Sequence, residues 1–192
     1  MRTSKTGPIR FERASALILL VFAGGSILDA IFGIAHLAGP GSFWAIQFMA
    51  ASIPLLIATG VWVALRKQKE LSRACLVMFL VAFPAWFVEF TSAIPVSWYL
   101  GVGLVLWAMR LGQNLLMWVG TSLLVLAAGA QFHLINYTGA MYLPFVITVP
   151  AFLCVAAYFQ WHQVRAQAQE IDLDEQEKDE LHLKRYGRLP NE

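Results

Sequence analysis

Two ionisable residues in a long apolar segment near the N-terminus have the types and spacing of a polar site inside a membrane. Asp29 and His36 are seven residues apart, and the residues between them are apolar or small. In a helix, a seven-residue step returns to the same face within about 20°, and Ser26 and Gly33 fall on that face as well. A carboxylate costs roughly 2.5–3.5 kcal/mol at the centre of a membrane helix. We therefore expect Asp29 to face protein or a cavity, where it would bind a cation, exchange protons or hydrogen-bond a neighbouring helix.

Later segments contain further residues that could share this site. They combine hydrogen-bonding amides and imidazoles, a second carboxylate and aromatic walls: Gln47, Trp86, Glu89, His133 and Tyr137. These residues also have structural interpretations. Gln47 and His133 could form hydrogen bonds between helices, and the carboxylate of Glu89 could extend to the membrane surface. All of them map to the outer half of the bilayer under one topology. The sequence therefore predicts a ligand-binding polar pocket that opens to the outside.

The sequence contains no motif for a metal or a catalytic nucleophile. There is no HExxH pattern and no pair of closely spaced cysteines, because the two cysteines are Cys75 and Cys154. We predict no metal site, the sequence identifies no cofactor, and the catalytic residues of any enzyme activity stay unknown. His36 and His133 could ligate a haem together. The only support for this hypothesis is that both are predicted to lie near the outer surface of the membrane.

The composition identifies the kind of element that must position these residues. Of the 192 residues, 58% are hydrophobic and 14% are charged, and the mean hydropathy is +0.61. Soluble domains have about 25% charged residues, so a soluble globular protein is excluded. The fold class that we expect is all-α, a polytopic integral membrane bundle whose direct partner is the lipid bilayer.

Six apolar runs have lengths near the roughly 20 residues that a membrane-spanning helix needs. They cover residues 14–38, 42–65, 73–92, 95–110, 114–134 and 140–162. The fourth is the shortest, since Pro95 opens it and Arg110 closes it. Pro54, Pro84 and Pro150 lie well inside their runs, and each is expected to kink its helix. We therefore predict six transmembrane helices.

Basic residues predict the orientation of these helices, because they favour cytoplasmic loops. They occur before residue 14, in the loop 66–73, at Arg110 and after residue 162, and they are missing from the alternate loops. Both termini are therefore expected in the cytoplasm, in a multi-pass protein that we assign to the bacterial inner (plasma) membrane. We divide the chain into a cytoplasmic segment 1–13, a membrane domain 14–162 and a charged, partly helical tail 163–192. These basic residues anchor loops and form no patch for nucleic acid.

Three functions are compatible with these features. The first is binding or translocation of a small polar or cationic solute. The second is an accessory or assembly subunit of a larger membrane complex, contacted through helix faces or the tail 163–192. The third is an intramembrane enzyme that acts on a lipid or isoprenoid through a carboxylate and a histidine. In size and expected topology the chain resembles the substrate-capturing membrane components of vitamin transporters, a likeness that assigns no residue a role.

Overall fold

The computed structural model describes residues 6–38, 43–68, 71–91, 97–132 and 142–186, and all regular structure within them is helical. The seven helices are α1 (Thr6–Ala38), α2 (Phe43–Ala51), α3 (Ile53–Leu65), α4 (Ser72–Thr91), α5 (Trp98–Leu111), α6 (Asn114–Gln131) and α7 (Tyr142–Tyr186). The prediction of an all-helical fold is confirmed for this part of the chain.

Four stretches of the described residues are long and apolar enough to cross a membrane. They are Phe11–Ala35 in α1, Ala45–Leu65 across α2 and α3, Arg73–Phe90 in α4 and Asn114–Gln131 in α6. Trp98–Leu111 is apolar but shorter. These stretches identify a multi-pass membrane protein, whereas six crossings and the orientation of the termini stay predictions.

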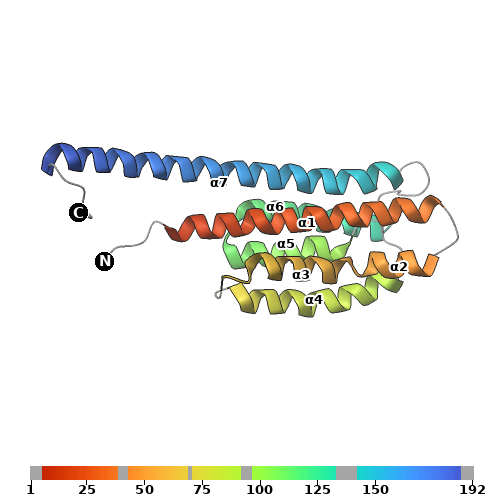
Figure 1. Cartoon of the computed structure of the whole chain (residues 1–192). Coiled ribbons are helices and arrows are strands. Elements are labelled where there is room, and N and C mark those ends of the chain that lie inside the picture. Colours follow the sequence, from red (N-terminus) through yellow and green to blue (C-terminus); the bar gives the residue numbers. More distant parts are fainter. Residues whose placement is uncertain (1–5, 39–42, 69–70, 92–96, 133–141, 187–192) are drawn as a thin grey trace.

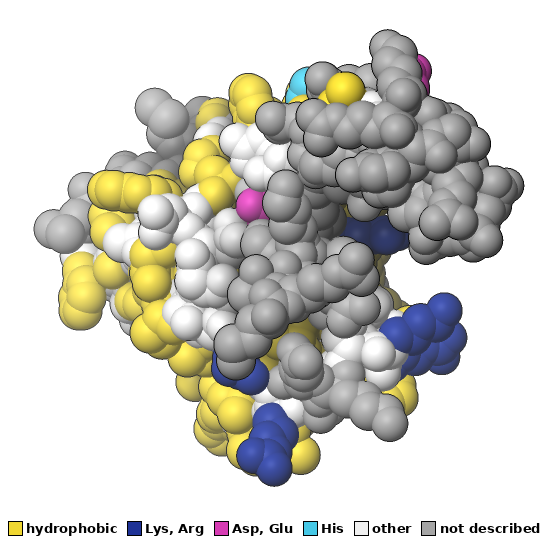
Figure 2. All heavy atoms as spheres, turned by 90° about the vertical axis from the view of Figure 1, so that its left-hand side faces the viewer, with side chains coloured by type: hydrophobic (Ala, Val, Ile, Leu, Met, Phe, Trp, Pro, Cys, Tyr) yellow, Lys and Arg dark blue, Asp and Glu magenta, His cyan; other side chains and the backbone are white. Residues whose placement is uncertain are grey.

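The helices form an elongated bundle in which α1 lies between α7 and α3 (Figure 1). Helix α1 packs most extensively on α7 and α3, and it also contacts α2 and α5; α5 pairs with α6, and α3 with α4. The first residues of α1 and the last turns of α7 lie at the same end (Figure 1). We call this the basic end, because Lys and Arg side chains lie on it (Figure 2), and Arg13, Arg66, Lys67, Arg73 and Arg110 belong to the helix ends and the α3–α4 connection on this side.

Buried side chains recur at spacings of three and four along the packed helices, which produces one continuous core. In α6 the buried positions are Leu116, Val119, Gly120, Leu123, Ala127, Gly129 and Ala130. In α7 they are Val146, Val149, Pro150, Leu153, Ala156, Ala157, Gln160 and Val164. Such a stripe is what a helix needs to face its neighbours rather than lipid. The stripe of α7 continues past residue 162, so packing does not end where the apolar run ends.

Two aromatic residues of the fourth apolar run are core residues. Tyr99 and Trp107 are each 1% exposed, and Tyr99 stacks on Phe22 with ring centroids 6.0 Å apart. In contrast, Trp118 is 74% exposed and Trp62 is 48% exposed. Hydropathy alone does not distinguish the buried aromatic residues from the exposed ones, because their burial depends on which helices pack against each other.

The second apolar run is broken rather than kinked. Helix α2 ends at Ala51 and α3 begins at Ile53, with Ser52 between them. Pro54 thus lies in the first turn of α3, where a missing amide leaves no hydrogen bond unmade. Pro84 and Pro150 lie inside α4 and α7, as expected.

Helix α7 continues without a break to Tyr186, beyond the ends of the other helices (Figure 1). The Gln167 amide donates to a carboxylate oxygen of Glu12 in α1 at 3.3 Å. Likewise, α1 begins at Thr6, ahead of the apolar run. The proposed boundaries near residues 13 and 163 therefore fall within helices and are not marked by helix ends.

Two glycines allow α5 and α6 to pack backbone against backbone. A Cβ atom added at Gly120 would lie 2.9 Å from the backbone nitrogen of Val105 and 3.0 Å from the carbonyl oxygen of Gly101. A Cβ atom added at Gly101 would lie 2.9 Å from the backbone nitrogen of Leu124. Backbone atoms cannot rotate away as side chains do, so this approach requires glycine.

Replacing Gly120 by Ala should separate α5 from α6 and destabilise the protein by about 1–3 kcal/mol, as overpacking does. The thermal unfolding midpoint of the purified protein in detergent measures this. Gly24→Ala is the matched control, since nothing lies within 4 Å of a Cβ added there. It should be neutral or slightly stabilising. Equal midpoints for the two variants would contradict the close packing of α5 and α6.

Candidate functional site

Two carboxylates from different helices lie at the bundle end opposite the basic end. Asp29 lies in the second half of α1, and Glu89 lies in the last turn of α4. Both are half-buried. The structure thus places at one end of the bundle the only two acidic residues of the apolar runs, although they are 60 positions apart in the sequence.

Ser97 contacts the carboxylate of Glu89 directly. Its hydroxyl donates a hydrogen bond to Glu89 Oε1, and the residue is 6% exposed. Ser97 immediately precedes α5, but its side chain caps no amide of that helix, so the hydroxyl serves Glu89 instead. The sequence analysis missed Ser97. A serine in a short apolar connection was the available signal, and it became specific only when α4 and α5 were placed.

Gln47 forms a structural contact with the last turn of α4. Its side-chain nitrogen donates to the main-chain carbonyl of Glu89 at 3.0 Å and lies 3.5 Å from that of Phe90. The last four carbonyls of a helix have no partner within it. Gln47 of α2 therefore caps α4. This contact favours the interhelical interpretation of Gln47 over direct ligand binding.

Tyr99 borders these residues on the core side. It lies two residues after Ser97, in the first turn of α5. Its hydroxyl donates a long hydrogen bond, 3.5 Å, to the carbonyl of Met78 in α4. The sequence analysis did not include Tyr99 among the site residues, because its position suggested a membrane-surface aromatic. We refer to Asp29, Gln47, Glu89, Ser97 and Tyr99 together as the polar cluster.

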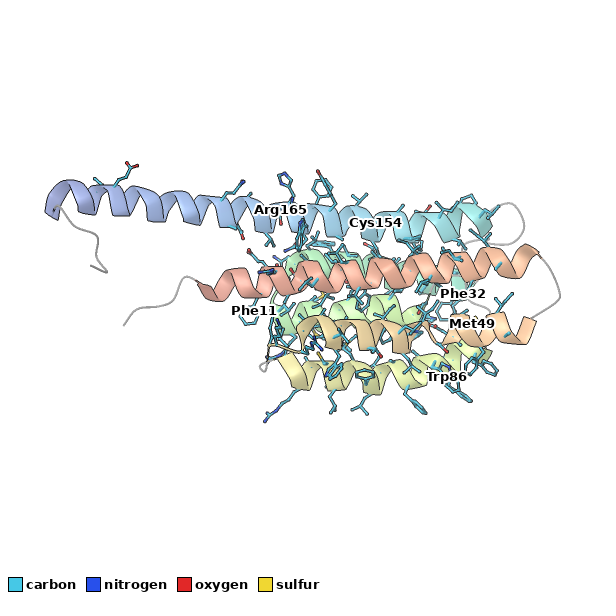
Figure 3. The ribbon with its side chains drawn as sticks, in the orientation of Figure 1. Phe11, Phe32, Met49, Trp86, Cys154 and Arg165 are labelled. Carbon is cyan, nitrogen blue, oxygen red and sulfur yellow. The ribbon has the colours of Figure 1, made fainter. Side chains whose placement is uncertain are left out.

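Trp86 lies on a more peripheral surface of α4. It contacts Phe48 edge to face at 6.2 Å and stacks on Phe90 at 6.1 Å. Phe48 is 54% exposed and Phe83, another neighbour at 6.2 Å, is 66% exposed. Figure 3 shows Trp86 at the end of the bundle where Phe32 and Met49 also lie. Its neighbours are thus aromatic and partly open to the surroundings, and its role as a pocket wall stays a prediction.

Three predicted site residues cannot be located relative to this cluster. His133 and Tyr137 lie outside the described residues, and the same holds for the side chain of His36, whose backbone belongs to α1. Among the side chains that the structure describes, no three His, Cys, Asp or Glu gather as metal ligands. Cys75 and Cys154 are free thiols, the first buried and the second exposed.

No lysine or arginine side chain that the structure describes lies near the polar cluster. All basic residues within the described ranges lie toward the basic end or in the α7 extension. The two carboxylates are thus supported by a hydroxyl but not by an arginine or lysine. In a low-dielectric setting two such groups favour the uptake of a cation or a proton between them.

Comparison of the chain with protein-family models, with curated proteins and with solved structures finds no match. No relative therefore assigns roles to the residues of the polar cluster. The function proposed below depends on the geometry and charge of this cluster and on the chemistry that they permit.

Replacing Gln47 by Leu should open the last turn of α4, because the carbonyls of Glu89 and Phe90 would lose their donor. The loss of about 1 kcal/mol, typical of one hydrogen bond, should speed amide exchange there roughly fivefold. Hydrogen–deuterium exchange with mass spectrometry of the α4 peptide measures this. Gln131→Leu, at an exposed position in α6, is the control. Unchanged exchange in Gln47→Leu would contradict the capping role.

Proposed function

We propose that this protein binds a small cationic solute between Asp29 and Glu89, in a pocket open to the outer side of the membrane. The observation that carries this proposal is that two half-buried carboxylates from separate helices lie at the same end of the bundle, where the structure describes no lysine or arginine side chain. A cation placed between them would relieve their repulsion and replace the missing counter-charge.

The neighbours of the two carboxylates have matching chemistry. Ser97 holds one Glu89 oxygen, which fixes the direction of that carboxylate. Asp29 gives the clearest evidence for a binding site. An ionised carboxylate in an apolar helix costs free energy, and helix packing alone does not require one.

The orientation that we propose places the basic end in the cytoplasm. Its basic residues agree with the positive-inside rule, and α1 begins where α7 ends, as an even number of crossings requires. Exposed aromatics suited to a membrane surface occur toward that end: Trp62, Trp118 and Tyr158. Arg165 lies over the Trp161 ring at 5.6 Å, in the manner of a headgroup-level anchor. Six crossings of the bacterial inner membrane are part of this proposal.

A second candidate function is an accessory subunit of a larger complex, which the extension of α7 favours. This helix reaches Tyr186, well beyond the bundle (Figure 1), and most of the acidic residues of the chain lie in it. A polar helix that leaves the membrane can serve as a docking element. Co-purification of a second protein that depends on residues 170–186 would support this candidate.

The enzyme interpretation requires a histidine beside the carboxylates as a proton-transfer partner. The side chains of His36 and His133 are the sequence candidates, and both lie outside the described part of the structure. This interpretation therefore stays a prediction from the sequence alone.

The topology predicts which loops an impermeant thiol reagent reaches from outside. In a background with Cys75→Ser and Cys154→Ser, a cysteine at Gly41 or Thr138 should be labelled in intact cells. A cysteine at Lys69 should react only after the membrane is opened. The reverse pattern would overturn the orientation and the outward-facing pocket with it.

Asp29→Asn tests the cation site, because it keeps the size of the side chain and removes its charge. Thermal unfolding of the purified protein is followed with sodium, potassium, ammonium, tetramethylammonium, choline and ethanolamine in turn. We expect at least one to stabilise the wild type, by about 2.7 kcal/mol at 100 times its dissociation constant. Asp29→Asn and Glu89→Gln should each abolish this stabilisation.

Glu12→Gln is the matched control, since it removes a carboxylate from the opposite end of α1. It should retain the full response to the stabilising cation. The proposal fails if no cation stabilises the wild type, or if Asp29→Asn responds as the wild type does. A circular-dichroism spectrum of each variant shows whether it has folded.

A further inference from the structure

A cavity opens at the basic end between the first turns of α4 and the last turns of α5. Its volume is about 340 Å³. Val77 and Met78 of α4 and Leu106 of α5 give it an apolar interior, and Arg73 and Arg110 also line it. The cavity is thus apolar inside, with two guanidinium groups among its lining residues. It lies at the opposite end of α4 from Glu89, so it is separate from the polar cluster.

Trp107 lines the same cavity and has an unmet hydrogen-bonding requirement. The residue is 1% exposed, and its indole nitrogen has no acceptor among the described residues. An indole N–H can only donate, and buried donors in folded proteins nearly always have a partner. This is the one ring nitrogen of the described core for which the protein supplies no acceptor.

The charge of the lining residues is uniformly positive. Arg73 lies in the first turn of α4 and Arg110 in the last turn of α5, and both are exposed. Arg110 follows Trp107 by three positions, which places the two on one face of α5. Among the described residues that line the cavity, none is acidic. Guanidinium groups bind phosphate through paired hydrogen bonds, so the ligand expected here has an anionic phosphate and an apolar chain.

We propose that this cavity binds one anionic glycerophospholipid of the surrounding membrane. An acyl chain lies along Val77, Met78 and Leu106, the phosphate contacts Arg73 and Arg110, and a lipid oxygen accepts the Trp107 N–H. Basic pockets between transmembrane helices are known sites for anionic headgroups. This proposal does not depend on the cation site, because the two lie at opposite ends of the bundle.

The alternative is that Arg73 and Arg110 attract anionic lipid only as part of the general positive charge of this end. Two variants separate these explanations. Val77→Phe fills the cavity and leaves every charge in place. The double variant Arg66→Gln, Lys67→Gln removes two exposed charges from the same end without altering any lining residue.

The experiment is native mass spectrometry of the full chain released from vesicles of equal parts phosphatidylglycerol and phosphatidylcholine. The wild type should retain one phosphatidylglycerol in preference to phosphatidylcholine. Val77→Phe and the double variant Arg73→Gln, Arg110→Gln should each lower that preference by roughly tenfold, equivalent to ~1.4 kcal/mol. Trp107→Phe should lower it as well, and the Arg66, Lys67 double variant should leave it unchanged.

Four results would overturn the proposal. They are an equal loss in the Arg66, Lys67 double variant, full retention in Val77→Phe, full retention in Trp107→Phe, and displacement of the lipid by millimolar inorganic phosphate. A loss in the Arg66, Lys67 double variant would show that general surface charge binds the lipid. Full retention in Val77→Phe or in Trp107→Phe would show that the cavity or the indole is not part of the site. Displacement by phosphate would show that the site binds the free anion. Thermal unfolding of each variant verifies that it is folded.

Discussion

The hydrogen bonds at the last turn of α4 determine how the carboxylate end of this bundle is assembled. The final carbonyls of a helix have no partner within it and must find donors elsewhere. Gln47 supplies one from α2, and Ser97, just before α5, binds the Glu89 side chain. These two contacts connect two separate segments to one turn of α4. They also fix the position of Glu89 at the end of the bundle where Asp29 of α1 lies.

The position of Asp29 depends in turn on how closely α1 approaches α3. A Cβ atom added at Gly25 would lie 2.3 Å from Ile57 Cγ1, and one at Gly60 would lie 2.8 Å from Val21 Cγ1. Each glycine thus receives a branched side chain of the other helix. Gly25 is one turn before Asp29, so the contact that brings the two helices together also sets the depth of the carboxylate. Gly25 and Asp29 lie on one face of α1, so the close contact at Gly25 helps to determine where the carboxylate of Asp29 lies.

The sequence predicts the features that depend on local pattern, and it misses those that depend on helix pairing. Apolar runs and charge spacing were sufficient to predict helices and to single out Asp29 and Glu89. The cap that Gln47 forms on α4 could not be predicted from the sequence. A glutamine that binds a neighbouring helix end and one that binds a ligand occupy the same kind of position in an apolar run. Ser97, Tyr99 and Trp107 acquire their surroundings only from the contacts of α4, α5 and α1. The break at Ser52 shows the same limit, since a proline inside an apolar run permits either a kink or a new helix.

The distribution of charge along α4 separates the carboxylates from the basic residues that the structure describes. Arg73 and Glu89 occupy opposite ends of this helix, and sixteen residues at 1.5 Å each separate them by about 24 Å. No side chain spans that distance, so Arg73 and Glu89 cannot form a salt bridge with each other. No lysine or arginine among the described side chains therefore neutralises Asp29 or Glu89. The proposed cation site depends on this separation, because a cation or a proton from the adjoining solution would supply the charge that these side chains do not.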